Sequence, residues 1–365
     1  MAVAKSVLPV EPAAQPGIPL GLVRTRAELG AVVGAAGEPG YRAEQVHRWV
    51  FSRGQADPQA MTSLPKPLRG RLSEVAWQRW LQPLKLEVDA DGTRKGLLSV
   101  HDSARPPAEI EAVLIPGRSR LTLCLSTQAG CAVGCPFCAT GLLGLRRNLS
   151  APEIAGQVLW AQSSAGRFPT HVVFMGMGEP LANWEAVRHA IDLLRGPDGF
   201  GIGSRRLTVS TAGVAPGILQ LAGEPGLQVN LALSLHAPND RLRDRLVPLN
   251  RRWPLEPLME AVRTYIRATR RRVSFEYVML ADVNDTPELA RELADRVGGL
   301  LCHVNLIPYN PVPGLPFEPS PDAAVKRFAG ILEGRGVAVT VRMPRGRSIH
   351  AACGQLGAAW RAAQR

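Results

Sequence analysis

The sharpest chemical signal in the chain is a group of cysteines between residues 131 and 138. Cys131, Cys135 and Cys138 form a C-x3-C-x2-C triplet, with Phe137 directly before the last thiol. Three soft thiolates on one short loop can bind three irons of a 4Fe-4S cluster and leave the fourth iron open to a substrate or cofactor. A tetrahedral zinc site is the alternative, with Cys124 or a histidine as its fourth ligand. The triplet therefore predicts metal chemistry, and a cluster is favoured over zinc.

Two further cysteines and one carboxylate stand out by their surroundings. Cys124 lies between two leucines in a predicted strand, and Cys353 lies among Ala and Gly near the end of the sequence. Glu111 is a carboxylate within the apolar run 110–115, which is typical of a tuned general base. Taken alone, the two thiols are better explained as packing residues and Glu111 as a polar residue on an edge strand. Cys302 is predicted to be a core residue.

These residues must be positioned by a repeating series of strands and helices. Strands are predicted at 121–126, 171–175, 207–211, 229–235, 274–280, 303–307 and 337–342, and helices at 151–163, 184–194, 214–222, 255–268, 286–297 and 321–333. Repeated βα units with buried strands predict a parallel sheet. The unusual polar stretches each follow the carboxyl end of a strand, where a parallel barrel collects its active site: 131–138, 176–180, 210–213, 234–239 and 308–313. We therefore expect an α/β fold, a partial (open) parallel β/α barrel, in preference to a doubly wound sheet.

The chain as a whole divides into five predicted segments. They are a flexible leader (1–20), an N-terminal helical accessory domain (21–87), a strand-rich connection that carries Glu111 (88–119), the barrel (120–356) and a C-terminal tail (357–365). The accessory domain has basic residues that we expect to contact RNA, with a solvated helix face as the alternative: Arg42, His47, Arg48, Arg53, Lys66, Arg69 and Arg71.

The composition is strongly basic. The formal net charge is +12, and 38 of the 43 basic residues are arginine. Because the planar guanidinium donates two bonds at once to phosphate, nucleic acid is the leading candidate partner. No apolar run approaches the ~20 residues needed to cross a bilayer. Since Pro9, Glu11 and Pro12 also interrupt any apolar stretch of a signal peptide, we expect a cytoplasmic protein with no membrane partner.

The segment 176–180, Gly-Met-Gly-Glu-Pro, adds a second motif downstream of the triplet. A glycine turn after a strand lets the backbone approach a ligand, and Glu179 can supply a countercharge to an ammonium group. Together with the triplet and Phe137, this segment resembles the radical S-adenosylmethionine (SAM) superfamily, in which it contacts the amino group of the methionine moiety.

The resemblance narrows to the RlmN/Cfr family of radical SAM methyltransferases, which modify an adenosine of large-subunit ribosomal RNA. It extends from about Gly37 to Leu356, and its marks besides the triplet are Thr122–Ser126, Arg147–Leu149, Ser234–Pro238, Asn305–Pro311 and Ala351–Leu356. In this family one SAM methylates a cysteine that matches Cys353, and a second SAM yields the radical that activates this methyl group. Glu111 matches the proton acceptor. Cys124 matches the resolving thiol, which releases the product and leaves a transient disulfide with Cys353.

The resemblance also implies the ligands and partners. The residues that match the family's SAM site are Gly178, Glu179, Ser210, Ser234, Leu235, His236 and Asn310. Ser210 can alternatively cap the following helix. The implied partners are large-subunit rRNA, a tRNA adenosine as a further substrate, a 4Fe-4S cluster, two SAM molecules per turnover and an external electron donor of the flavodoxin or ferredoxin type. We expect a monomer.

Three alternatives stay open at this point. The predicted product carries the methyl group on carbon 2 of the adenosine, but the motifs alone also allow the Cfr-type reaction at carbon 8. A radical enzyme on another substrate would leave Cys124 and Cys353 without a role, and the third alternative is a nucleic-acid-binding protein with a structural metal. The chain also departs from the family at 345–350, Arg-Gly-Arg-Ser-Ile-His, where acidic residues usually flank the isoleucine. This departure bears on how Cys353 is positioned.

Overall fold

The computed structural model describes residues 17–343 and 345–357 of the chain. Most of the predicted leader and tail lies outside the described residues, but Ile18 and Pro19 form strand β1 and Leu20 is buried. The described chain forms two compact units. The first unit contains the residues up to Ala129 together with Arg147–Gly176 and Asn183–Leu207; the second contains Gly130–Arg146, Met177–Ala182 and the residues from Thr208 onwards.

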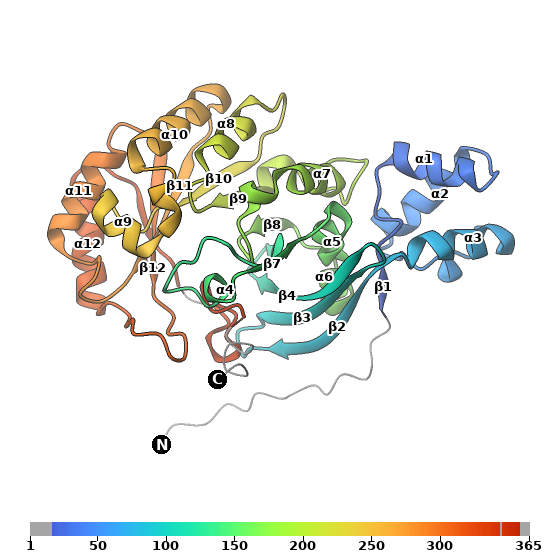
Figure 1. The fold of residues 1–365 in the computed structure, drawn as a ribbon, viewed down its shortest axis with the longest axis horizontal. Helices are drawn as coiled ribbons and strands as arrows, with labels where there is room; N and C mark the ends of the chain where they lie inside the picture. The colour runs from blue at the N-terminus through green and yellow to red at the C-terminus, as the bar shows by residue number, and fades with distance from the viewer. Residues whose placement is uncertain (1–16, 344, 358–365) are drawn as a thin grey trace, which may run out of the picture. The chain divides into compact units, whose positions relative to one another are not determined.

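The N-terminal part of the first unit is helical, as the sequence predicts. Its helices are α1 (Arg26–Ala35), α2 (Tyr41–His47) and α3 (Lys66–Ala76), with a π-helical turn at Arg48–Ser52 and a 3-10 turn at Pro58–Ala60. Thr25 and Glu28 form a capping box that satisfies the first amides of α1. These helices are drawn in blue in Figure 1.

The strands of the first unit form a sheet in the order β1-β2-β3-β4-β5-β8. The strands after β1 are β2 (Arg79–Val88), β3 (Arg94–Asp102), β4 (Arg105–Pro116), β5 (Leu121–Cys124) and β8 (His171–Phe174). The pairs from β1 to β5 are antiparallel, whereas β5 and β8 are parallel. Gly92, with φ +81°, forms the tight turn between β2 and β3. Helices α5 (Ala151–Ala155), α6 (Gln157–Ala165) and α7 (Trp184–Leu194) belong to the same unit.

The second unit is built from repeated parallel βα units. Its strands are β9 (Leu207–Thr211), β10 (Asn230–Ser234), β11 (Val273–Met279), β12 (Cys302–Pro308) and β13 (Val339–Val341), each paired in parallel with the next. Its helices are α4 (Ala139–Leu142), α8 (Ala215–Gly223), α9 (Asp240–Leu246), α10 (Leu255–Thr269), α11 (Pro287–Val297) and α12 (Asp322–Gly334). α10 packs beside α8, and α11 beside α12 (Figure 1). The predicted parallel sheet is therefore present in this unit.

Several elements differ from the pattern expected from the sequence. The helix expected at 151–163 is divided into α5 and α6 at Gly156, where an added Cβ would lie 2.4 Å from the side chain of Leu20. The short helices α4 and α9 were not predicted, nor were β6 (Gln128–Gly130) and β7 (Leu145–Asn148), which pair as a separate small sheet. Within the described part of the chain, no helix is both long enough and apolar enough to span a membrane.

Candidate active site

The cysteine triplet lies on the loop between β6 and α4, in the second unit. The amide of Cys131 donates to the carbonyl of Gly144 (2.9 Å), and the amide of Cys138 donates to the carbonyl of Cys135 (3.1 Å). Gly130, with φ +79°, lets the base of the loop close, because a Cβ there would lie 1.8 Å from the Gly144 carbonyl oxygen. The loop is therefore held in a defined shape by its own backbone.

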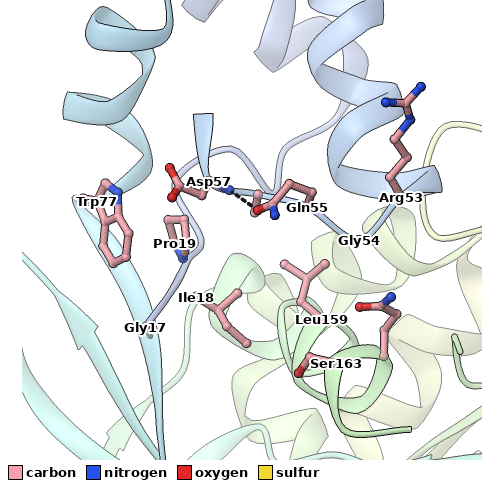
Figure 2. Close-up of a pocket in the computed structure, with 12 residues that line it drawn as sticks. Gly17, Ile18, Pro19, Arg53, Gly54, Gln55, Asp57, Trp77, Leu159 and Ser163 are labelled. Carbon is pink, nitrogen blue, oxygen red and sulfur yellow. Dashed lines mark hydrogen bonds between the residues drawn. The ribbon is translucent and has the colours of Figure 1, made fainter. Parts of the chain in front are cut away.

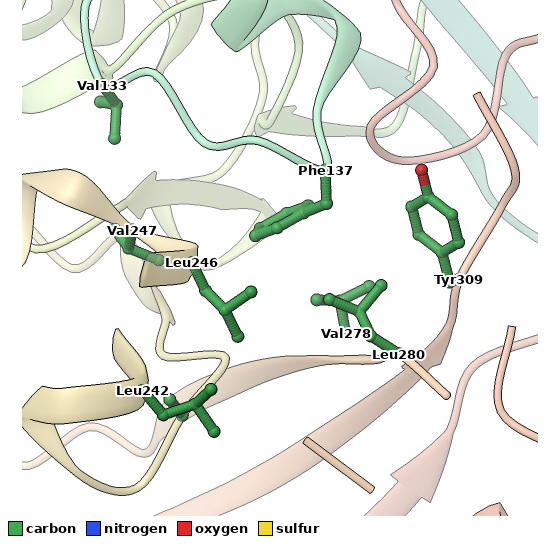
Figure 3. Close-up of a cluster of buried hydrophobic side chains, with 9 residues drawn as sticks. Val133, Phe137, Leu242, Leu246, Val247, Val278, Leu280 and Tyr309 are labelled. Carbon is green, nitrogen blue, oxygen red and sulfur yellow. The ribbon is translucent and has the colours of Figure 1, made fainter. Parts of the chain in front are cut away.

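An apolar cluster surrounds the three thiols. Figure 3 shows Phe137 and Val133 of the loop facing side chains from α9, from the end of β11 and from Tyr309. Cys131, Cys135 and Cys138 pack against this cluster and are partly exposed. Burial raises the pKa of all three thiols, to about 12 for Cys131 and well above the ordinary value for Cys135, and the neighbouring thiols raise the latter further. The thiols therefore lie close enough to influence one another, in surroundings that oppose a bare thiolate.

A metal cluster fits this donor set. Iron binds soft thiolates and deprotonates them on binding, so bound irons would reverse the pKa effect of burial. Among the described residues, no three His, Cys, Asp or Glu side chains are arranged to hold a single metal ion. A 4Fe-4S cluster makes a different demand, because each of the three thiolates binds its own iron.

Cys353 lies on a turn that is fastened to the cysteine loop. The amide of Ala139, the residue after Cys138, donates to the carbonyl of Gly354 (2.8 Å), and the Thr140 hydroxyl donates to the carbonyl of Leu356 (2.7 Å). The side chain of Cys353 is exposed, and its electrostatic influence reaches Cys138. The structure therefore brings the predicted methyl carrier to the end of the triplet.

Asn310, a predicted SAM ligand, is linked to the same C-terminal turn. It is buried, and its side-chain oxygen accepts a hydrogen bond from Nε of Arg347 (3.1 Å). Gln355 donates to the carbonyl of the next residue, Pro311 (2.9 Å). Arg347 belongs to the segment that departs from the family pattern, so this departure places a guanidinium directly on a predicted ligand residue.

The carboxylate of Glu179 connects two backbone segments. It accepts hydrogen bonds from the amides of Leu181 (3.0 Å) and Ala212 (2.6 Å) and is almost fully buried. Burial raises its pKa to about 7, although these hydrogen bonds and one from Thr211 act in the opposite direction. Both carboxylate oxygens therefore accept bonds from the protein itself. Gly178, the residue directly before Glu179, has a φ of +104°, a backbone conformation that residues with a Cβ rarely adopt.

Ser234 and Leu235 lie at the end of β10, where a buried arginine organises the backbone. Arg243 of α9 is fully buried and donates to the carbonyls of Ala212 (2.5 Å), Ser234 (3.1 Å) and Leu235 (3.0 Å). It also donates to the side chain of Asn250 (2.8 Å). Burial lowers the pKa of this guanidinium to about 10, so it remains charged at neutral pH. Arg243 is not predicted from the sequence, because it is one of many arginines and nothing in the local pattern signals its burial.

His236 is buried beside the cysteine loop. Its ring lies edge-on to Phe137, with 5.1 Å between centroids, and Nδ1 accepts from the amide of Val278 (3.1 Å). Burial lowers its pKa to about 3, and the nearby Arg243 adds to this effect. The imidazole is therefore neutral, with its proton on Nε2. The backbone is strained at this residue, with φ +58°, and its carbonyl accepts from Asn284 (2.9 Å).

Ser210 is partly buried near the carboxyl end of β9. Helix α8 begins after its N-cap Val214, which has no side-chain capping bond. In the turn before the helix, the hydroxyl of Thr211, the neighbour of Ser210, accepts from the amides of Gly213 (3.0 Å) and Val214 (3.1 Å). Ser210 and Ser234 are thus near the ends of adjacent parallel strands, with Ala232 directly opposite Ser210. This is the edge of the sheet at which a parallel barrel binds its ligands.

Glu111 and Cys124 lie on adjacent strands of the first unit. Cys124 on β5 is directly opposite Val113 on β4, and Glu111 is two residues from Val113. Because side chains alternate along a strand, Glu111 and Cys124 are diagonal neighbours on one face. Glu111 is buried and Cys124 is partly exposed. The structure therefore brings the predicted base and the predicted resolving thiol together, and it adds Lys95, whose ammonium lies 3.6 Å from Glu111. No local sequence pattern marks Lys95 as a functional residue.

The described chain also contains a cavity of about 530 Å³ in the first unit (Figure 2). It is lined by residues of β1, the loop 53–57, α6 and Trp77, whose side chain is exposed. Arg53 at its rim stacks over the ring of Trp49, at 4.1 Å from the centroid. None of the predicted catalytic or SAM-binding residues lines it, so the predicted chemistry is located elsewhere.

Some basic residues of the N-terminal helices are paired or buried within the protein, and others are exposed to solvent. Arg71 pairs with Glu38 (2.8 Å), and Arg69 donates to the carbonyl of Gln59 (2.9 Å). His47 is buried, which lowers its pKa. Arg48 and Lys66 are exposed.

Two family models match this chain. Residues 125–294 match the radical SAM superfamily, and residues 22–77 match the ribosomal RNA large subunit methyltransferase N-terminal domain. The chain is 46% identical over 336 residues to the probable dual-specificity RNA methyltransferase RlmN of Thermosynechococcus vestitus, which covers 92% of this chain and 97% of that relative. It is 47% identical over 329 residues to the corresponding protein of Gloeobacter violaceus, covering 90% of this chain and 92% of that one.

A solved structure is similar over the same extent. The crystal structure of a radical SAM methyltransferase from Sphaerobacter thermophilus is 48% identical in sequence, with a TM-score of 0.88, and the match covers 92% of this chain and 98% of that one. The cysteine triplet and the mixed α/β sheet define a radical SAM enzyme, with the open barrel and N-terminal domain expected from the sequence. Membership in this superfamily implies a 4Fe-4S cluster and SAM as cofactors.

Within that superfamily, the chain belongs to the RlmN family of RNA methyltransferases. The resemblance seen in the sequence is confirmed, and RNA is the implied substrate.

Proposed function

We propose that this enzyme methylates carbon 2 of an adenosine in large-subunit rRNA, and of a tRNA adenosine, through a methyl group carried on Cys353. The observation that carries this proposal is the fastening of the Cys353 turn to α4, directly after Cys138. This places an exposed thiol beside the residues that would hold the cluster. The chemistry requires a radical, because the aromatic C–H carbon of adenine is a poor nucleophile towards a sulfonium donor.

Cys131, Cys135 and Cys138 would hold the cluster. When bound, the cluster would supply the one-electron chemistry of SAM cleavage and of adduct oxidation, and Cys353 would carry the methyl group from which hydrogen is removed. Cys353 thus receives a methyl group from one SAM, and its sulfur then joins the protein to the RNA through a methylene bridge. Two SAM molecules are consumed per product.

Glu111 and Cys124 complete the reaction. The carboxylate of Glu111 accepts the proton from carbon 2 of the adenine, which restores the aromatic ring. The thiolate of Cys124 then attacks the sulfur of Cys353. A sulfur–sulfur bond forms, the bond from sulfur to the methylene carbon breaks, and its electron pair takes up a proton to give the methyl product. External reductant must reduce the disulfide before the next turnover.

The SAM site is proposed at the strand ends of the second unit. Ser210, Ser234, Leu235, His236 and Asn310 supply hydroxyls, an imidazole, backbone groups and an amide, and Gly178 allows close backbone approach. Glu179 acts by tying Ala212 to the 176–180 segment, and the positive charge of bound SAM would favour its charged form. The two amide bonds to its carboxylate support this positioning role.

We further propose that the enzyme works in the cytoplasm as a monomer and takes electrons from a flavodoxin or ferredoxin type donor, because reductive cleavage of SAM needs a one-electron reductant. The exposed basic side chains of the N-terminal region are proposed to contact the RNA phosphates; they are Arg48, Arg53 and Lys66. The arginine-rich composition supports this role.

The two-thiol mechanism is tested by Cys124→Ala, with Cys302→Ala as the matched control. Cys124→Ala retains methylation of Cys353 and addition to adenine but cannot release the product. Purified from cells, it should carry RNA that ribonuclease trims and that mass spectrometry detects on the Cys353 peptide. Cys302→Ala should be free of RNA. A Cys124→Ala protein that is free of RNA and still turns over would show the mechanism to be wrong.

The position of the methyl group is tested by mass spectrometry of nucleosides from rRNA and tRNA of cells with and without the gene. The expected product is 2-methyladenosine in both RNAs. Chromatography against standards separates the 8-methyl isomer. Its detection in place of 2-methyladenosine would show that the enzyme methylates carbon 8.

A further inference from the structure

A buried lysine lies between two carboxylates in the first unit. Nζ of Lys95 is 3.0 Å from Oε2 of Glu87 and 3.6 Å from Oε1 of Glu111. The side chains of Lys95 and Glu111 are only 6% and 4% exposed. Lysine is almost never buried to this extent unless it is paired, so the two carboxylates explain why the ammonium can be here.

The sheet register brings these groups to one face. Glu87 on β2 is directly opposite Lys95 on β3, and Leu97 is directly opposite Glu111 on β4. Because Lys95 and Leu97 are two residues apart, Lys95 is the diagonal neighbour of Glu111. The other titratable groups on this face are Lys85 of β2, His101 of β3, Glu109 of β4 and Cys124 of β5.

Lys85 shares the partner Glu87 with Lys95 but is far more exposed and has no ion pair with Glu111. Its Nζ lies 2.9 Å from Oε1 of Glu87, and its side chain is 55% exposed. Glu87 thus accepts from two ammonium groups, and the two lysines together lower its pKa, against the opposing effect of burial. Glu87 is therefore shared between two ammonium groups, and Glu111 is the second carboxylate partner of Lys95.

We propose that Lys95 is a positioning residue that keeps the Glu111 carboxylate charged and aimed for proton transfer. The inference rests on the proposed role of Glu111 as the proton acceptor. An opposite charge within about 4–6 Å favours the charged form of a carboxyl group, and a base must be charged to accept a proton. When Glu111 takes the proton it becomes neutral, while Lys95 keeps Glu87 as its partner, so the transfer leaves no buried ammonium unpaired.

The test compares Lys95→Met with Lys85→Met. Each variant removes one lysine that contacts Glu87, but only Lys95 contacts Glu111. The readout is the decay of the RNA adduct on the Cys353 peptide in a single turnover, followed by quenching and mass spectrometry across a range of pH. This reports the release stage rather than overall activity.

In a plot of the adduct decay rate against pH, the acidic limb is the range in which the rate rises as Glu111 loses its proton. For Lys95→Met we expect this limb to move to higher pH by at least about one unit, with the wild-type rate recovered at high pH. At a pH on that limb, release should slow by roughly tenfold or more. Lys85→Met should keep the wild-type limb, and Lys95→Arg should restore it. A role in folding alone would lower the rate equally at every pH. Should Lys95→Met fail to fold, the double variant with Glu87→Gln removes the whole Lys95–Glu87 ion pair and should show the same shift.

An unshifted limb in Lys95→Met, or in the double variant, overturns the role of Lys95. Glu111→Gln in the same assay separates this from the proposed function. If Glu111→Gln accumulates adduct while Lys95→Met is unshifted, only the positioning role is wrong. If Glu111→Gln releases the product with the wild-type profile, both the base assignment and the role of Lys95 are overturned.

Discussion

Replacing Arg243 by Met should weaken both the fold of the second unit and its affinity for SAM. The guanidinium donates four hydrogen bonds, to three backbone carbonyls and to Asn250. Hydrogen bonds to charged groups contribute about 1.5–3 kcal/mol each, which sets a ceiling of roughly 6–12 kcal/mol. Water that enters the vacated space would satisfy part of this set. Each buried acceptor left without its donor costs about 1–3 kcal/mol, and because water would replace part of the set we expect a loss of about 3–5 kcal/mol in the free energy of unfolding.

The assay is urea unfolding followed by circular dichroism, with equilibrium dialysis of SAM on the folded protein. Arg245→Met is the control, because Arg245 is exposed on the same helix, and it should change the free energy of unfolding by no more than about 0.5 kcal/mol. SAM affinity should fall only in Arg243→Met, since Arg243 holds the carbonyls of Ser234 and Leu235. Equal unfolding midpoints and slopes for the two variants would refute the reasoning.

Three further predictions follow from the site and the composition. Replacing any one of Cys131, Cys135 or Cys138 by Ala should abolish iron and sulfide loading after anaerobic reconstitution, whereas Cys302→Ala should load normally; full loading of a triplet variant would contradict the cluster assignment. RNA affinity should fall at least roughly a hundredfold between about 50 and 200 mM salt, as measured by filter binding, because arginine–phosphate contacts release counterions; a flat response would argue against a basic interface. The folded-state pKa of His236, about 3, is lower than its ordinary value of 6.5, so the unfolded chain binds this proton more tightly and stability is lost as pH falls below 6.5. Relative to His236→Gln, the wild type should lose about 2 kcal/mol between pH 7 and 5 in urea titrations, and parallel curves for the two proteins would count against burial as the cause.

The sequence predicted those parts of the site that are local in the chain. The triplet and the 176–180 segment can be recognised from the spacing of their residues. Glu111 can be recognised because it is a charged residue within an apolar run. The alternating strands and helices of the second unit are visible for a similar reason: on α10, buried residues recur at helical spacing, as at Leu255, Leu258 and Val262.

What the sequence could not predict depends on pairing between distant segments. Lys95 follows a turn and looks like a solvated residue until the register places it beside Glu111. Arg243 lies in the run Asp-Arg-Leu-Arg-Asp-Arg-Leu (240–246), where its neighbours Arg241 and Arg245 are exposed and only packing distinguishes it. The need for glycine at position 156 depends on the side chain of Leu20, more than a hundred residues away. In each case the deciding contact comes from a tertiary neighbour rather than from local propensity.

The hydrogen bonds between α4 and the Cys353 turn also impose an order in time. The turn is synthesised roughly 215 residues after Cys138. At about 5–20 residues per second, this interval lasts on the order of 10–40 s. During it the growing chain already contains the three thiols of the loop but lacks the thiol that would carry the methyl group. Biosynthesis therefore delivers the radical-forming half of the proposed site first, and the catalyst is complete only when the late turn docks on a loop made long before it.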